Sequence, residues 1–137
     1  TMVPMPNHTT INDKALIKMI SKDKLDQIVD RTRKGGAEII KLLEKGSAFY
    51  APAAAAVEMA ESYLKNLKKT LPCAAYLKGE YGFKDLYAGV PVIIGAKGVE
   101  KVLEIKLDAN EKKNFEVSIN AVKELFESAL KLDADLK

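Results

Sequence analysis

Histidine and cysteine are almost absent from this sequence, whose 137 residues contain one of each, His8 and Cys73, and no tryptophan. A lone cysteine excludes an internal disulfide and favours a reducing compartment, so a cytoplasmic location is expected. Metal ligation needs several donors at regular spacing, and His8 has no such companions, so no metal site is predicted. We interpret His8 as a solvated loop residue and Cys73, which stands in an apolar run, as a small core residue.

Long apolar runs and a strong excess of one charge are also missing. No apolar stretch approaches the roughly 18 residues of a membrane-spanning helix, and residues 1–6 do not read as a signal peptide. The net charge of +3 is spread over mixed acidic and basic positions. Neither nucleic acid nor a membrane is therefore predicted as a partner. A chain of this length is sufficient for one globular domain and too short for a second full one.

Apolar residues spaced three and four positions apart predict a long helix that begins after the N-cap Ser21 and runs to about Lys45. Gly35 and Gly36 interrupt this helix. They either admit another helix or chain at short range or act as a hinge. We expect Gly46 to end the helix as a C′ glycine.

Two more helices are predicted. One spans about residues 51–68, with Glu58 and Glu61 on an ordinary charged face. The other opens on a capping box formed by Asp108 and Glu111 and runs to about Lys131. The last helix is expected to bury one stripe of residues against the rest of the chain: Phe115, Ser118, Ile119, Val122, Leu125, Phe126 and Ala129.

Between the second and the last of these helices, the spacing of the apolar residues changes to that of strands. Strands are predicted at residues 71–77, 86–95 and 103–107, and together they form an antiparallel meander. The middle strand is nearly all apolar, so we expect it to be buried on both faces, with a bulge or a missing ladder bond at Pro91. Residues 2–11 favour an edge strand or extended connection, and residues 14–20 a short helical turn. The predicted fold class is α+β, with long helices packed on a small antiparallel sheet.

Residues 46–60 combine a small-residue loop with the start of an alanine-rich helix. Gly46, Ser47 and Ala48 have almost no side chain, so another molecule can approach the backbone closely, and Pro52 fixes φ where the helix begins. The loop is therefore either a working surface or a plain connector. Elsewhere, Gly95 to Gly98 leads into a strand and lacks the helix N-terminus that would hold a phosphate. The residues can shape a pocket but carry no self-contained set of acid, base or metal ligands.

Three stretches together resemble one family: KGSAFYAPAAAAVEMAESYLK at residues 45–65, DRTRKGGAEII at residues 30–40 and YAGVPVIIGAKGVE at residues 87–100. They are similar to the C-terminal half of NAD-dependent malate dehydrogenases of the lactate-dehydrogenase-like type, over nearly the whole chain. The resemblance implies that residues 1–137 form the lactate/malate dehydrogenase C-terminal domain. It also implies that the N-terminal Rossmann domain, which binds most of the NAD, lies outside this chain.

The resemblance assigns no catalytic residue to this chain, because the family's catalytic histidine precedes a segment like residues 1–4 and His8 does not match it. It implies that Ser47 and Ala48 line the substrate pocket and that Pro52 contacts the nicotinamide ring of NAD. The implied partners are malate or oxaloacetate, the chain's own Rossmann domain and further copies in a homo-oligomer. The helix from Lys22 to Lys45 contributes to subunit contacts in the family.

Two alternatives stay open at this point. The same domain could belong to an L-lactate dehydrogenase, because the family's choice between these substrates depends largely on an upstream loop. Arg31, Thr32 and residues 35–38 favour malate. The chain as given could instead act as a non-catalytic oligomerisation module. Under either enzymatic interpretation, this chain alone is predicted to be inactive.

Overall fold

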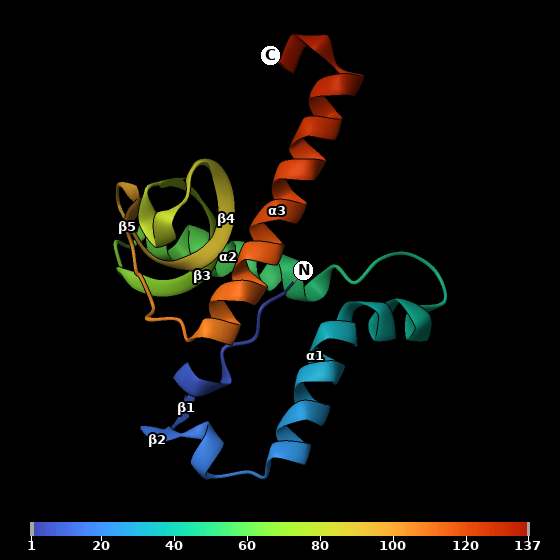
Figure 1. Cartoon of the computed structure of the whole chain (residues 1–137), viewed down its shortest axis with the longest axis vertical. Helices are drawn as coiled ribbons and strands as arrows, with labels where there is room; N and C mark the ends of the chain where they lie inside the picture. The colour runs from blue at the N-terminus through green and yellow to red at the C-terminus, as the bar shows by residue number, and fades with distance from the viewer. Residues whose placement is uncertain (1, 137) are drawn as a thin grey trace. The chain divides into compact units, whose positions relative to one another are not determined.

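The computed structural model describes residues 2–136, which form two compact units: residues 2–52 and the remainder from residue 53. The first contains η1 (Pro6–His8), β1 (Thr10–Ile11), β2 (Lys14–Ala15), η2 (Leu16–Lys18) and α1 (Lys22–Leu43). Helix α2 (Tyr50–Leu64) begins at its end and continues into the second unit. There follow β3 (Lys69–Lys78), η3 (Glu80–Gly82), β4 (Lys84–Gly95), β5 (Gly98–Val102), α3 (Ala109–Leu132) and η4 (Ala134–Leu136) (Figure 1).

Within the first unit, α1 starts where the sequence predicts. The hydroxyl of Ser21 accepts a hydrogen bond from the Lys24 N–H at 3.4 Å. Residues 2–11 form an extended connection, the 3-10 turn η1 and the short strand β1, which pairs with β2. The helical turn predicted for residues 14–20 is reduced to η2, because Lys14 and Ala15 pair with β1 instead.

The expected C′ role of Gly46 is wrong. Helix α1 ends at Leu43, and the residue with left-handed backbone geometry at its C-cap is Glu44, with φ of 59°. Gly46, with φ of 88°, lies two residues farther on. It therefore turns the loop and does not cap the helix.

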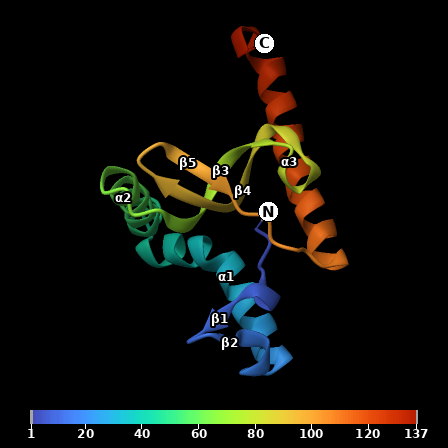
Figure 2. The same ribbon diagram turned by 90° about the vertical axis from the view of Figure 1, so that its left-hand side faces the viewer.

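The second unit contains an antiparallel sheet in the order β3-β4-β5, which confirms the predicted meander and the α+β class. Figure 2 shows the β3–β4 hairpin twisting strongly beside α3. Pro72 and Pro91 lie opposite each other in the ladder, so neither residue of this pair can donate a ladder hydrogen bond. The expectation of a missing bond at Pro91 is met, and the register irregularity of the β4–β5 pair lies between Ile93 and Ile94.

Strand β4 is buried on one face only, contrary to the prediction. Ala88, Val90, Val92 and Ile94 are buried, whereas Tyr87, on the opposite face, is 62% exposed. That second face carries Tyr87, Gly89, Pro91 and Ile93, none of which is charged, so the run looked uniformly apolar. The buried face joins Ala75, Leu77 and Ile119 of α3 in the core of the unit.

The third strand was predicted too late in the sequence. Strand β5 ends at Val102, and residues 103–107 continue without ladder pairing. The Leu103 N–H still donates to the Pro91 carbonyl of β4 at 2.8 Å, but the next backbone groups bond elsewhere: Tyr81 Oη donates to the Leu103 carbonyl at 2.7 Å and accepts from the Ile105 N–H at 2.9 Å. Tertiary contacts with Tyr81 therefore replace the strand that the alternation of residues 103–107 predicted.

Two helix predictions need correction at their ends or faces. Helix α2 stops at Leu64 because Asn66 and Lys68 have left-handed backbone geometry. Helix α3 opens on the predicted capping box, with Asp108 accepting from the Glu111 N–H at 2.8 Å. Its predicted apolar stripe is not buried throughout, since Leu125 and Phe126 are 73% and 59% exposed.

The Tyr81 hydroxyl provides a test of this part of the fold. Tyr81→Phe leaves the Leu103 carbonyl and the Ile105 N–H without this partner, so we expect the free energy of unfolding to fall by about 1–3 kcal/mol. Urea denaturation measures this loss. Tyr50→Phe, at a side chain that is 78% exposed, is the matched control and should change stability little.

Ionisation of Tyr81 is expected to lower the stability of the fold at high pH. Burial is the main cause that raises the pKa of the Tyr81 phenol above 10.0; the Glu104 carboxylate adds to this and the Ile105 N–H opposes it. A folded-state pKa above the unfolded value means that the contribution is complete below about pH 10 and is lost as the pH rises further. The alkaline loss of stability should therefore be smaller in Tyr81→Phe than in the wild type; equal losses would contradict this assignment.

Candidate functional site

The loop singled out in the sequence connects α1 to α2. Residues 44–49 adopt no regular structure, and the positive φ of Gly46 turns the chain toward Ser47 and Ala48. Ala48 is half-buried, whereas Ser47 is exposed. The aromatic rings of Phe49 and Tyr50 follow with their centroids 4.7 Å apart.

Pro52 occupies the first turn of α2, where a backbone N–H has no partner within the helix. Its ring is exposed. The structure thus places the three predicted site residues, Ser47, Ala48 and Pro52, on one loop and the helical turn that follows it. Their roles in binding substrate and nicotinamide stay predictions.

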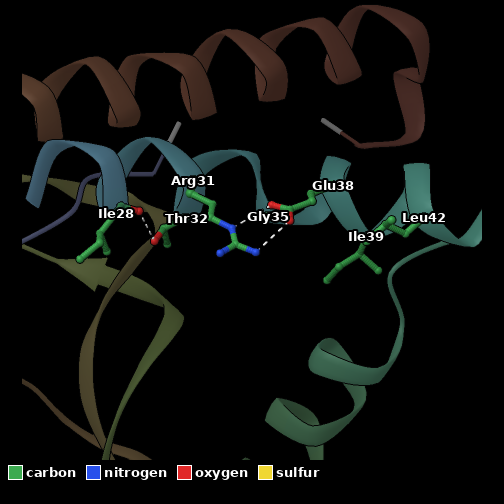
Figure 3. A pocket seen from close by; sticks show the side chains of 7 residues that line it. All are labelled: Ile28, Arg31, Thr32, Gly35, Glu38, Ile39 and Leu42. Carbon is green, nitrogen blue, oxygen red and sulfur yellow. Dashed lines mark hydrogen bonds and ion pairs between the residues drawn. The ribbon is translucent and has the colours of Figure 1, made fainter. Parts of the chain in front are cut away.

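A second feature of the first unit is a groove along α1, which sequence reasoning missed. It has a volume of about 540 Å³ and is lined by Ile28, Arg31, Thr32, Gly35, Glu38, Ile39 and Leu42 (Figure 3). Figures 1 and 2 both show α1 changing direction near its middle, where the glycine pair falls in the sequence.

A glycine pair and a threonine that bonds back to a carbonyl are features typical of helix bends, and α1 contains both. A Cβ built on Gly35 or Gly36 would meet no atom within 4 Å among the described residues, so nothing in this structure packs against them. The hydroxyl of Thr32 donates to the Ile28 carbonyl at 2.7 Å, a bond that tends to bend helices. The alternative of close approach by another chain stays open for a larger assembly.

Arg31 and Glu38 bridge the groove across the bend. Arg31 donates to both carboxylate oxygens of Glu38, through Nη2 at 2.9 Å and Nε at 3.2 Å. This hydrogen bonding, reinforced by charge attraction, lowers the pKa of the Glu38 carboxyl and raises that of Arg31. The spacing of seven residues, about two helical turns, was the sequence signal that could have identified the pair.

Among the described residues, no set of side chains at the loop could transfer protons or bind a metal ion. Within residues 2–136, no group of three or more His, Cys, Asp or Glu side chains is placed to hold a metal ion. Burial raises the pKa of the Cys73 thiol, whose Sγ lies 3.3 Å from Met59 Sδ. His8 lies in η1. The loop can therefore form one wall of a site, and no reactive group is placed on that wall.

No helix in the described part of the chain is both long and apolar enough to cross a membrane.

This architecture is that of an α+β domain. It carries a loop of small residues between α1 and α2 and an exposed groove on α1. Comparison with known families gives a match over residues 1–132 to the lactate/malate dehydrogenase, alpha/beta C-terminal domain. The chain belongs to this family. Nearly every described element lies within the matched region, so the fold class predicted from sequence is confirmed.

Individual relatives agree with this assignment. The chain is 59% identical over 141 aligned positions to a malate dehydrogenase of Pelagibacter ubique, with 99% of this chain and 44% of the relative covered. A solved malate dehydrogenase from Salinibacter ruber superposes with a TM-score of 0.93 at 44% identity, covering 98% of this chain and 44% of that one.

A lactate dehydrogenase from Eimeria maxima, solved with NADH and oxamate, superposes with a TM-score of 0.91 at 39% identity. The alignment covers 96% of this chain and 42% of that one. The chain thus spans less than half the length of each of these relatives.

Proposed function

We propose that this chain is the substrate-side domain of a cytoplasmic, NAD-dependent malate dehydrogenase, which interconverts (S)-malate and oxaloacetate. The observation that carries the proposal is the 59% identity to a malate dehydrogenase across 99% of the chain. The small-residue loop supports it, because a wall without bulky side chains lets substrate and a flat cofactor ring approach each other. In the full-length protein, a Rossmann domain upstream of this chain would hold most of the cofactor.

The residues present fit such a cofactor only at its reactive end. NAD supplies the hydride acceptor when it is bound. Pro52 presents an exposed apolar ring that has no N–H to bury, which suits packing against the nicotinamide. Ser47 and Ala48 would line the substrate side and help to exclude water, so that the two reacting carbons reach the roughly 3–3.5 Å needed for transfer.

Lactate dehydrogenase is the second candidate, favoured by the Eimeria maxima structure with its TM-score of 0.91. The 59% identity to the Pelagibacter ubique malate dehydrogenase exceeds the 43% and 39% to two solved lactate dehydrogenases, whereas solved malate dehydrogenases range from 35% to 44%. The fold does not separate the two substrates, because this domain superposes on both enzymes. We therefore place malate first on identity.

We also propose that the full-length protein is a homo-oligomer in which α1 contributes to the subunit interface. Ile28, Ile39 and Ile40 of α1 are each at least 41% exposed in this structure, an apolar surface unusual for a free helix. Analytical ultracentrifugation of the full-length protein is expected to show a dimer or larger species. A monomer at micromolar concentration would contradict the proposal.

The proposed function predicts a clear difference between this chain and its full-length parent. Purified residues 1–137 should show no malate oxidation with NAD, because the chain carries no catalytic base at the loop. The same sequence joined to its Rossmann domain should turn over malate and oxaloacetate. Absorbance of NADH at 340 nm measures both reactions. Turnover by the 137-residue chain, or none by the full-length protein, would overturn the proposal.

A further inference from the structure

Helix α2 has an unusual buried residue. Of the residues in Tyr50–Leu64, only Ser62 is buried, and its exposed fraction is 0%. The alanines of the helix are exposed, and so are Val57 and Leu64, at 67% and 78%. Met59 packs against the core of this unit but is only partly buried, so within residues 53–136 apolar burial fixes this helix on the sheet only in part.

The Ser62 hydroxyl instead bonds to two strands at once. It donates to the Ile94 carbonyl of β4 at 2.7 Å and accepts from the Lys69 N–H of β3 at 3.2 Å. Lys69 and Ile94 are partners at the end of the β3–β4 ladder. One side chain thus bonds to both residues of the terminal pair of the β3–β4 ladder and attaches the helix to the sheet.

The other contacts of α2 with the sheet lie close to Ser62. The Glu58 carboxylate pairs with Lys69 Nζ at 3.2 Å, and Met59 Sδ contacts Cys73 Sγ at 3.3 Å. Glu58 is 49% exposed and pairs with a solvated lysine, so it contributes little. The attachment of the helix is concentrated in its last two turns, and Ser62 is its fully buried member.

We propose that Ser62 is a positioning residue for the loop of the active site, acting through the direction of α2. This inference rests on the proposed function, because Pro52 at the start of α2 is the residue expected to contact the nicotinamide. Pro52 and Ser62 are ten residues apart on one helix, a distance of about 15 Å. A small rotation of α2 about Ser62 therefore displaces Pro52 by a larger distance. A misplacement of about 1 Å near reacting atoms can cost about 100-fold in rate.

A hydroxyl suits this position better than other small groups. Alanine would leave both the Lys69 N–H and the Ile94 carbonyl without their partner in a site closed to solvent. Cysteine keeps a similar shape, but a thiol is a weaker donor and acceptor. The two variants therefore form a graded series.

The experiment measures kcat and KM for oxaloacetate reduction by the full-length protein, together with the thermal midpoint of each variant. Ser62→Ala is expected to lower kcat at least about 10-fold at temperatures well below its midpoint, and Ser62→Cys to fall between Ser62→Ala and the wild type. Ile119→Val, at a core position of α3 that is 1% exposed, is the control. It should lower the midpoint and leave kcat near the wild-type value.

The possible results separate the positioning role of Ser62 from the proposed function. Wild-type kcat in Ser62→Ala would overturn the positioning role and leave the proposed function standing. A fall in kcat for Ile119→Val in proportion to its lowered midpoint would also overturn it, because general destabilisation would then explain both variants. If Ser62→Ala does not fold, wild-type kcat in Ser62→Cys overturns the role instead. A wild-type protein without oxaloacetate reduction would refute the proposed function itself.

Discussion

Replacing Ala48 by leucine in the full-length protein is expected to lower kcat/KM for oxaloacetate at least about 100-fold while the protein still folds. Ala48 is half-buried on the loop that we propose lines the substrate. A leucine there projects three further carbons into a space that must bring the substrate carbon and the nicotinamide within about 3–3.5 Å. A 100-fold loss corresponds to about 2.7 kcal/mol of transition-state stabilisation.

The matched control is Ala121→Leu, the same change at an exposed position of α3, which should retain wild-type kcat/KM. Pro52→Trp tests the cofactor side of the same loop and should raise KM for NADH. Circular dichroism of each variant reports whether it folds. If Ala48→Leu and Pro52→Trp fold and keep wild-type turnover, the loop is only a connector.

Leu77→Ala is expected to cost the 137-residue chain about 2–5 kcal/mol of unfolding free energy. Leu77 is fully buried at 0% exposure, in the core that joins the sheet to Ile119 of α3. Its removal leaves a cavity that the surrounding strands fill only in part. Because a domain of this size is stable by only about 5–15 kcal/mol, this is among the largest single effects expected.

Urea denaturation followed by circular dichroism measures the loss. Leu132→Ala, at a residue of α3 that is 90% exposed, makes the same chemical change outside the core and should alter stability by less than about 0.5 kcal/mol. Equal effects of the two substitutions would show that the sheet does not form the core described here.

Local signals predicted the starts of the helices well. The N-cap at Ser21 and the capping box at Asp108 and Glu111 depend on side chains that bond to backbone groups at most three residues away. Such bonds are encoded in a few consecutive residues. The sequence was correspondingly correct about where α1 and α3 begin.

Predictions that depended on distant partners were less accurate. The alternation of residues 103–107 indicated a strand, but the Tyr81 hydroxyl, more than twenty residues away, bonds to the Leu103 carbonyl and the Ile105 N–H. The apolar stripe of α3 was expected to be buried throughout. In its second half, Leu125 and Phe126 are 73% and 59% exposed.

Some features of the candidate site could likewise be predicted from nearby residues, and others could not. The small-residue character of Ser47 and Ala48 could be read directly from the sequence, whereas their expected ligands came from family resemblance. The groove on α1 was not predicted from the sequence; the bend seen in this helix lies in the same region. Ser62 was missed because a serine within an alanine-rich helix carries no local sign that its hydroxyl bridges two strands.

We propose that this chain completes a malate dehydrogenase. The most direct measurement compares kcat/KM of the full-length protein, expressed from its parent gene, for oxaloacetate and for pyruvate, with NADH in both reactions. A malate dehydrogenase is expected to show a clear preference for oxaloacetate. A preference for pyruvate would assign the domain to a lactate dehydrogenase, and reduction of neither substrate would contradict an enzymatic role in this family.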